Sequence, residues 1–146
     1  MSYTCTRIHY IWSTAQRELT IDPAWRDDLH AYIAGILKNK KSTVLQIGGV
    51  EDHVHVYCSL PTTVTIADLA NVMKANSTAY VREKFAASFA WQEGYAAFTM
   101  GKSADDDVCA YIRNQVEHHR TRSFKEELIA FLDKYQVPYD PKYVFA

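Results

Sequence analysis

Residues 48–60 constrain the fold more than any other stretch, because two glycines lead into a run in which polar and apolar side chains alternate. Successive side chains of a strand point to opposite faces of a sheet. The polar set is His53, His55 and Tyr57, and the apolar set is Val54, Val56 and Cys58. The apolar set predicts a core face, and Gly48-Gly49 predicts a turn before the strand. Two imidazoles on the opposite face suit a metal site, although this spacing alone is equally compatible with two histidines on a solvated strand face.

The composition is typical of a globular protein. The 146 residues are 48% hydrophobic and 23% charged, which predicts one domain over residues 1–146. The formal net charge of −1 excludes a global basic field, so any nucleic acid must be bound by local patches. Three cysteines without a Cys-x-x-Cys pair suit a reducing compartment. We see no membrane-spanning stretch or signal peptide, and we therefore expect a cytoplasmic protein without a membrane partner.

Hydrophobic periodicity predicts four strands and four helices. The strands are expected at residues 3–12, 42–49, 53–60 and 94–100, and the helices at residues 22–41, 65–85, 103–120 and 123–135. The first six elements follow the order β-α-β-β-α-β. This order predicts an α+β fold, ferredoxin-like or RRM-like, with an antiparallel sheet and helices on one face. The other face would be left free for a ligand, and C-terminal helices would follow the sheet.

The helix expected at residues 103–120 carries a polar stripe. At about 100° per residue, Tyr111, Gln115 and His118 fall on one face. A tyrosine at the core boundary of a helix with a polar face is the alternative. Beside His53 and His55, however, the carbonyl oxygen of Gln115 can complete a two-histidine metal site with open positions. Tyr111 is then a candidate covalent nucleophile, because a divalent ion stabilises charge on a bound phosphate.

Three segments together resemble the single-tyrosine HUH transposases of bacterial insertion sequences, to which REP-associated tyrosine transposases are closely related. The segments are Gly48-Gly49-x-x-Asp52-His53-Val54-His55, Tyr111-Ile-Arg-Asn-Gln115-x-Glu-His118-His119 and Ser123-Phe-x-Glu-Glu-x-x-x-Phe-Leu. The resemblance spans nearly the whole chain. It implies that His53, His55 and Gln115 bind the metal and that Tyr111 is the catalytic nucleophile. Ala15-Gln16 departs from the basic residue expected there in relatives.

The resemblance also implies an activity and its partners. The chain would cleave and rejoin single-stranded DNA at insertion-sequence ends through a 5′-phosphotyrosine intermediate, recognising subterminal hairpins. Mg²⁺ or Mn²⁺ would be the cofactor and a homodimer the assembly, although imidazole ligands by themselves favour Zn²⁺ or Mn²⁺. The candidate DNA contacts are Lys74, Arg82, Arg113, His118, His119 and Arg120. Four large aromatic side chains fit either base stacking or, more commonly, the core: Trp12, Tyr57, Phe89 and Trp91.

Two alternative functions stay open. A domesticated relative would keep the nuclease activity and act on chromosomal hairpin repeats. A non-catalytic, RRM-like nucleic-acid-binding module explains the fold, but it gives no reason for His53, His55, Tyr111 and Gln115 to converge. The chain also lacks the aromatic signature that such sheets carry.

Overall fold

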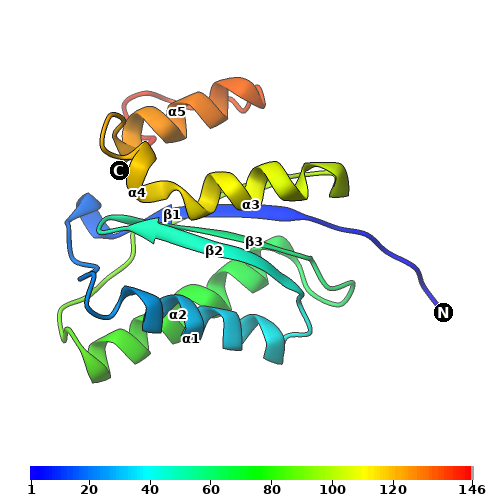
Figure 1. The fold of residues 1–146 in the computed structure, drawn as a ribbon, viewed down its shortest axis with the longest axis horizontal. Helices are drawn as coiled ribbons and strands as arrows, with labels where there is room; N and C mark the ends of the chain where they lie inside the picture. The colour runs from blue at the N-terminus through cyan, green and yellow to red at the C-terminus, as the bar shows by residue number, and fades with distance from the viewer. Residues whose placement is uncertain (146) are drawn as a thin grey trace.

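The computed structural model describes residues 1–145 and contains a four-stranded antiparallel sheet with helices on both faces (Figure 1). The strands are β1 (Ile8–Ser13), β2 (Val44–Val50), β3 (His53–Cys58) and β4 (Ala96–Thr99). The α-helices are α1 (Arg26–Asn39), α2 (Ile66–Lys84), α3 (Asp105–Arg113), α4 (Gln115–His118) and α5 (Phe124–Lys134), and the short 3-10 turns are η1 (Ala15–Arg17) and η2 (Lys102–Ala104). The strand order β2-β3-β1-β4 confirms the predicted ferredoxin-like α+β fold.

One face of the sheet packs on α1 and α2. Val54, Val56 and Cys58 are buried in this core together with Tyr10 and Trp12 of β1, as the alternation predicts. Each fully buried large apolar side chain contributes about 1.5–3 kcal/mol to the free energy of folding, relative to the same side chain exposed to water. The alternate side chains of β1 and β3 consequently point to the opposite face, where the C-terminal helices lie.

The second face of the sheet is covered rather than free. Ile11 and Phe98 form a smaller core there with Phe124, Leu128 and Leu132 of α5. An amphipathic helix needs an apolar partner for its stripe, and the sheet supplies one. The expectation of an open face is therefore wrong for most of this surface.

The predicted Gly-Gly turn is also wrong. Gly48 and Gly49 lie inside β2, paired with His55 and Val54, and the turn comes after them at residues 51–52. A Cβ atom at Gly48 would lie 2.5 Å from the carbonyl oxygen of Ile112. Glycine is needed at this position because it lets the backbone of α3 approach the sheet closely.

The helix predicted over residues 103–120 is interrupted. Helix α3 ends at Arg113, and α4 begins at Gln115 after Asn114, whose φ of −95° and ψ of 21° are not helical. Asparagine favours helix ends because its short polar side chain competes for backbone hydrogen bonds. The break turns α4 towards α5 (Figure 1). It also leaves Gln115 buried.

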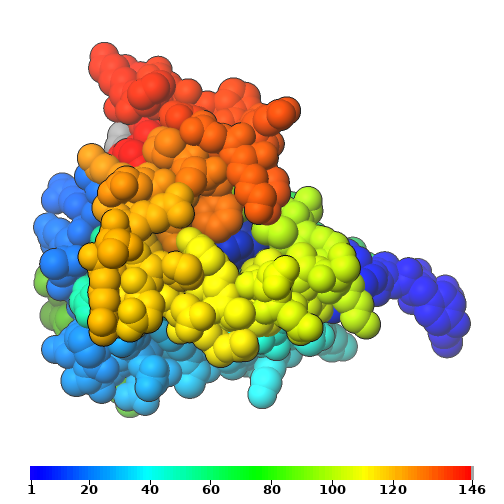
Figure 2. All heavy atoms as spheres, turned by 45° about the horizontal axis from the view of Figure 1, so that its top comes forward, coloured from blue at the N-terminus to red at the C-terminus, as the bar shows by residue number. Residues whose placement is uncertain are grey.

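The first strand is shorter than predicted. It begins at Ile8 rather than at residue 3. Thr6 and Arg7 are hydrogen-bonded to Leu60 and Asp105, and residues 1–5 extend away from the body without a regular element (Figures 1 and 2). Cys5, Cys58 and Cys109 are free thiols.

We predict that Gly48→Ala lowers the free energy of unfolding by about 1–3 kcal/mol, because the added methyl group overlaps the α3 backbone. Gly35→Ala in α1 is the matched control: its Cβ would meet nothing within 4 Å, and the change should stabilise the protein by about 0.4–1 kcal/mol. Urea unfolding of both variants measures the difference. Equal stability of the two variants would mean that α3 does not need this close approach.

Candidate active site

Strand β3 places His53 and His55 on the face that carries α3, α4 and α5, and both imidazoles are buried. The Nδ1 of His53 donates a hydrogen bond to Asp52 Oδ1 over 2.7 Å. Nδ1 of His55 lies 2.8 Å from Nε2 of His9, a buried side chain of β1. These contacts orient both rings so that each Nε2 points towards the C-terminal helices. A partner on the other ring nitrogen is the usual way in which a metal-binding histidine is oriented.

Tyr111 of α3 and Gln115, the first residue of α4 after the break at Asn114, both lie at these two imidazoles. Gln115 Oε1 lies 2.9 Å from His53 Nε2, and the Gln115 amide nitrogen donates to Glu127 Oε2 over 3.2 Å. The centroid of the Tyr111 ring lies 5.9 Å from that of the His55 ring. The four side chains singled out from the sequence as catalytic or metal-binding therefore converge on one buried point.

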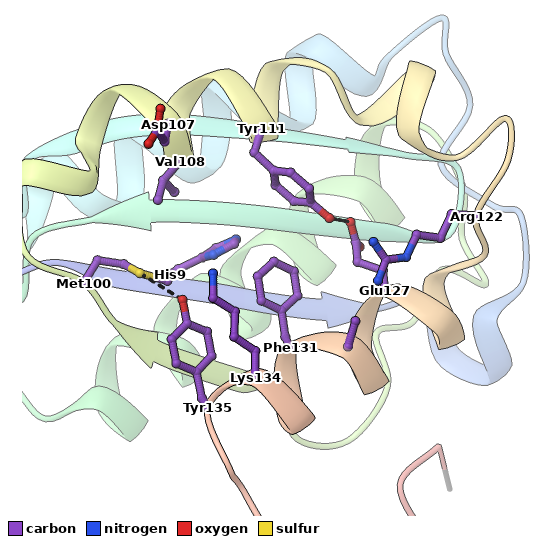
Figure 3. A pocket seen from close by; sticks show the side chains of 11 residues that line it. His9, Met100, Asp107, Val108, Tyr111, Arg122, Glu127, Phe131, Lys134 and Tyr135 are labelled. Carbon is purple, nitrogen blue, oxygen red and sulfur yellow. Dashed lines mark hydrogen bonds between the residues drawn. The ribbon is translucent and has the colours of Figure 1, made fainter.

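Glu127 lies at the centre of the same cluster, although sequence reasoning did not identify it. Its Oε1 is 3.0 Å from His55 Nε2 and 3.3 Å from His53 Nε2. Its Oε2 is 3.3 Å from His119 Nε2 and accepts a hydrogen bond from the Tyr111 hydroxyl (Figure 3). The carboxylate is 1% exposed.

A signal for Glu127 was present in the sequence. Phe124, Leu128 and Phe131 repeat at helical spacing, and Glu127 falls inside that apolar stripe. A carboxylate in such a stripe is buried, and buried carboxylates are almost always paired. The stripe therefore predicts a charged partner opposite α5, but it cannot say which one.

The balance between burial and contacts differs from group to group, and it decides which groups in the cluster are charged. Burial raises the pKa of Glu127, but its contacts with His55, His119 and His53 outweigh this and hold the pKa well below its usual value. Burial lowers the pKa of His53, but hydrogen bonds with Asp52 and Glu127 raise it to about 9. Burial, followed by the neighbouring Glu127 charge, raises the pKa of Tyr111 above its usual 10.0. At neutral pH Glu127 is an anion and Tyr111 a neutral phenol that donates to it.

The donor atoms of the cluster fit a divalent cation. Their distances of 2.9–3.3 Å resemble those between neighbouring ligands of an octahedral ion with bonds of about 2.1 Å, which are about 3 Å apart. His53, His119 and Glu127 also have ligand atoms within 4.8 Å of one another. Imidazole nitrogens mixed with carboxylate and amide oxygens suit Mn²⁺ or Zn²⁺, and the oxygens also suit Mg²⁺. A metal ion and a proton would compete for the same lone pair of His53.

The candidate DNA contacts fall into two groups. Lys74 donates to the carbonyl oxygens of Gln92 and Gly94, and Arg82 donates to that of Phe89, so both side chains hold the loop before β4.

The other four candidate contacts lie on α3, on α4 or just after it. The ring centroids of His118 and Tyr111 are 4.5 Å apart, and those of His119 and His53 are 4.4 Å apart. Arg113 and Arg120 are exposed, and Arg120 forms a surface ion pair with Glu117. The aromatic side chains Trp12, Tyr57, Phe89 and Trp91 are all buried, in agreement with the core interpretation.

Comparison with known proteins identifies a family and two solved structures with a similar fold. Residues 2–115 match the family model described as "Transposase IS200 like". A crystal structure of a proposed transposase from Deinococcus radiodurans R1 has a TM-score of 0.64 and 20% identity, covering 79% of this chain and 95% of that chain. The structure of a REP-associated tyrosine transposase bound to a REP hairpin has a TM-score of 0.61 and 13% identity, covering 82% of this chain and 74% of that chain. No match was found among curated proteins. Within residues 1–145, no helix has the length and apolar character needed to cross a membrane.

We predict that Glu127→Ala lowers the free energy of unfolding by about 1–3 kcal/mol, because the Tyr111 hydroxyl and the Gln115 amide lose their buried acceptor. Glu117→Ala removes the same charge from an exposed surface pair and should cost less than about 1 kcal/mol. Urea unfolding in the presence of a chelator measures both. A Glu127→Ala variant as stable as Glu117→Ala would contradict the assigned role of the carboxylate.

Proposed function

Because the chain belongs to the IS200-like transposase family, we propose that it cleaves and rejoins single-stranded DNA through a 5′-phosphotyrosine intermediate on Tyr111. One observation supports this proposal most strongly. The Tyr111 hydroxyl donates to a buried carboxylate that also lies within 3.3 Å of both imidazoles of β3. A nucleophile, a proton acceptor and a set of metal ligands thus occupy the same point, which is the arrangement that phosphoryl transfer needs.

The side chains of the cluster divide the steps of the reaction between them. The oxygen of Tyr111 attacks the scissile phosphorus. Its proton moves along the existing hydrogen bond towards Glu127 and is released to water, because the low pKa of Glu127 keeps the carboxylate ionised. The phosphorus–oxygen bond to the 3′ oxygen breaks, and that oxygen leaves and takes a proton from water. Rejoining is the reverse reaction with a different 3′-hydroxyl group, so the energy of the phosphodiester bond is kept in the tyrosine ester. In rejoining, the incoming 3′-hydroxyl group gives its proton to water, and the departing Tyr111 oxygen takes one from water and again donates to Glu127.

We propose that His53, His55 and Gln115 hold the divalent ion, Mn²⁺ or Mg²⁺, and that Glu127 is a further oxygen donor. When bound, such an ion withdraws charge from the non-bridging phosphate oxygens. Asp52 and His9 orient the two imidazoles from behind. Gln115 can act as a ligand because its amide nitrogen is already committed to Glu127, which leaves Oε1 facing His53.

The proposed substrate is single-stranded DNA with hairpins, and the proposed assembly is a homodimer. The substrate proposal is supported by the family match and by the structural relative that is bound to a REP hairpin. Mobilisation of an insertion sequence and a domesticated role on chromosomal hairpin repeats both use this chemistry. Size-exclusion chromatography with light scattering tests the homodimer.

A non-catalytic RRM-like module is less well supported. Such a module reads RNA on the exposed face of its sheet. In this chain α3, α4 and α5 lie over that face (Figure 1), and they bury His53 and His55 of the sheet together with Glu127 of α5. A buried cluster of titratable groups serves no purpose in surface stacking of bases.

We predict that the protein incubated with Mn²⁺ and a hairpin oligonucleotide forms a covalent adduct that survives denaturing electrophoresis, and that Tyr111→Phe abolishes it. The loss is expected because only the phenolic oxygen can form the phosphotyrosine bond. Tyr80→Phe, in α2 on the other side of the sheet, is the matched control and should keep the adduct. Adduct formation by Tyr111→Phe would show that another residue is the nucleophile.

We predict that His53→Ala reduces Mn²⁺ binding below detection in isothermal titration calorimetry, and that Asp52→Asn weakens the binding by about 10–100-fold because the imidazole loses its orienting partner. His30→Gln, a change of a histidine in α1, is the control and should bind Mn²⁺ like the wild type. The titrations use the Tyr111→Phe background without DNA, so that metal binding is measured apart from catalysis. Unchanged affinity in His53→Ala would rule out the proposed ligand set.

A further inference from the structure

A cleft of about 350 Å³ opens between α3 and α5, directly beside Tyr111 and Glu127. Figure 2 shows it as a hollow between the yellow-green atoms of α3 and the orange atoms of α5, with blue N-terminal atoms at its floor. Figure 3 shows His9 below the cleft and Tyr111 on its α3 side, with the α5 side chains opposite. Its volume is at the lower end of the range for small-molecule sites, about 300–1,000 Å³.

Two cationic side chains line the cleft from the side of α5. Arg122 precedes the helix, and Lys134 ends it; both are exposed, and neither forms an ion pair within residues 1–145. Both point into the cleft in Figure 3, Arg122 beside Glu127 and Lys134 towards His9. Asp107 lies on the opposite rim, on α3, and is exposed. The cationic groups therefore flank the approach to the Tyr111 hydroxyl, where an anionic substrate has to come.

The wall between these two cations is aromatic. Phe131 and Tyr135 are half-buried, and their rings are parallel within 2° with centroids 6.4 Å apart. The hydroxyl of Tyr135 contacts the sulfur of Met100, which fixes the ring at the edge of the cleft. Phe98 stacks on both rings, and Lys134 Nζ lies 5.3 Å from the Tyr135 ring centroid, so a base has only the remaining ring surface to contact. Aromatic rings next to cations are the features with which proteins bind unpaired nucleotides without reading a long sequence.

We propose that this cleft binds the unpaired nucleotide next to the scissile phosphate, with its phosphate groups at Arg122 and Lys134 and its base against Phe131 or Tyr135. The proposal rests on the proposed function, and it names the substrate subsite of the same active site. The family match ends at residue 115. Both cations and both aromatic rings therefore lie in the C-terminal segment that follows the matched region.

The first test measures the salt dependence of DNA binding. A fluorescein-labelled, single-stranded oligonucleotide is titrated with the Tyr111→Phe protein at several salt concentrations, and binding is followed by fluorescence anisotropy. Each lost phosphate contact flattens the slope of log Kd against log salt by about 0.7 for a single strand. The double change Arg122→Gln with Lys134→Gln should therefore flatten the slope by about 1.4. An unchanged slope would overturn the proposal.

A matched double variant controls for net charge. Lys38→Gln with Lys84→Gln removes two exposed cations from α1 and α2, on the other side of the sheet. Its slope should equal that of the parent protein. An equal flattening in both double variants would mean that only overall charge matters, and it would count against the subsite.

The aromatic wall has its own control pair. Tyr135→Leu should weaken binding of the same oligonucleotide by about 5- to 150-fold through the loss of stacking, whereas Tyr143→Leu, at an exposed ring of the C-terminal tail, should leave it unchanged. Equal effects of the two changes would remove the stacking part of the proposal.

The covalent adduct assay distinguishes failure of the subsite from failure of the proposed function. Absence of adduct in the wild type refutes the proposed function, whereas wild-type adduct with an unchanged slope in the Arg122 and Lys134 variant refutes only the subsite.

Discussion

The arrangement of the candidate active site depends on the contacts that surround the buried carboxylate of Glu127. An isolated anion in a protein interior is costly, and it persists only if charged or hydrogen-bonding groups surround it. Here three imidazoles, a phenol and an amide do so: His53, His55, His119, Tyr111 and Gln115. These groups come from β3, α3, α4 and the residue after α4, so a single carboxylate on α5 ties the C-terminal helices to the sheet.

Two backbone features make that convergence possible. Gly48 has no side chain to collide with the backbone of Ile112, so α3 can lie close to β2. Asn114 ends α3, and the chain then turns so that Gln115 enters the interior instead of continuing along the helix. A regular helix lying further from the sheet would keep Tyr111 and Gln115 on one face, but it would not bring both to His53 and His55.

The two faces of the sheet have different tasks. The face towards α1 and α2 is a continuous apolar core that stabilises the fold and places β1 and β3. The face towards α3 and α5 combines a smaller apolar cluster with a buried polar cluster and the cleft beside Tyr111. Stability and chemistry are thus carried by alternate residues of the same strands.

The order of elements and the face of His53 and His55 were determined by the sequence alone, because strand alternation and helix capping are local properties. Tyr111 as the nucleophile and His53, His55 and Gln115 as metal ligands were predicted from motifs at fixed spacing, and the structure brings the four side chains together. The Gly-Gly turn was predicted wrongly because close packing of α3 on β2 decides that position. The continuous helix was predicted wrongly because the backbone leaves the helical conformation at Asn114. Glu127, the orienting role of His9 and the cleft were decided only by the tertiary structure. All three depend on where α5 packs on the sheet. That position is set by contacts between residues far apart in the chain, which no local sequence pattern encodes.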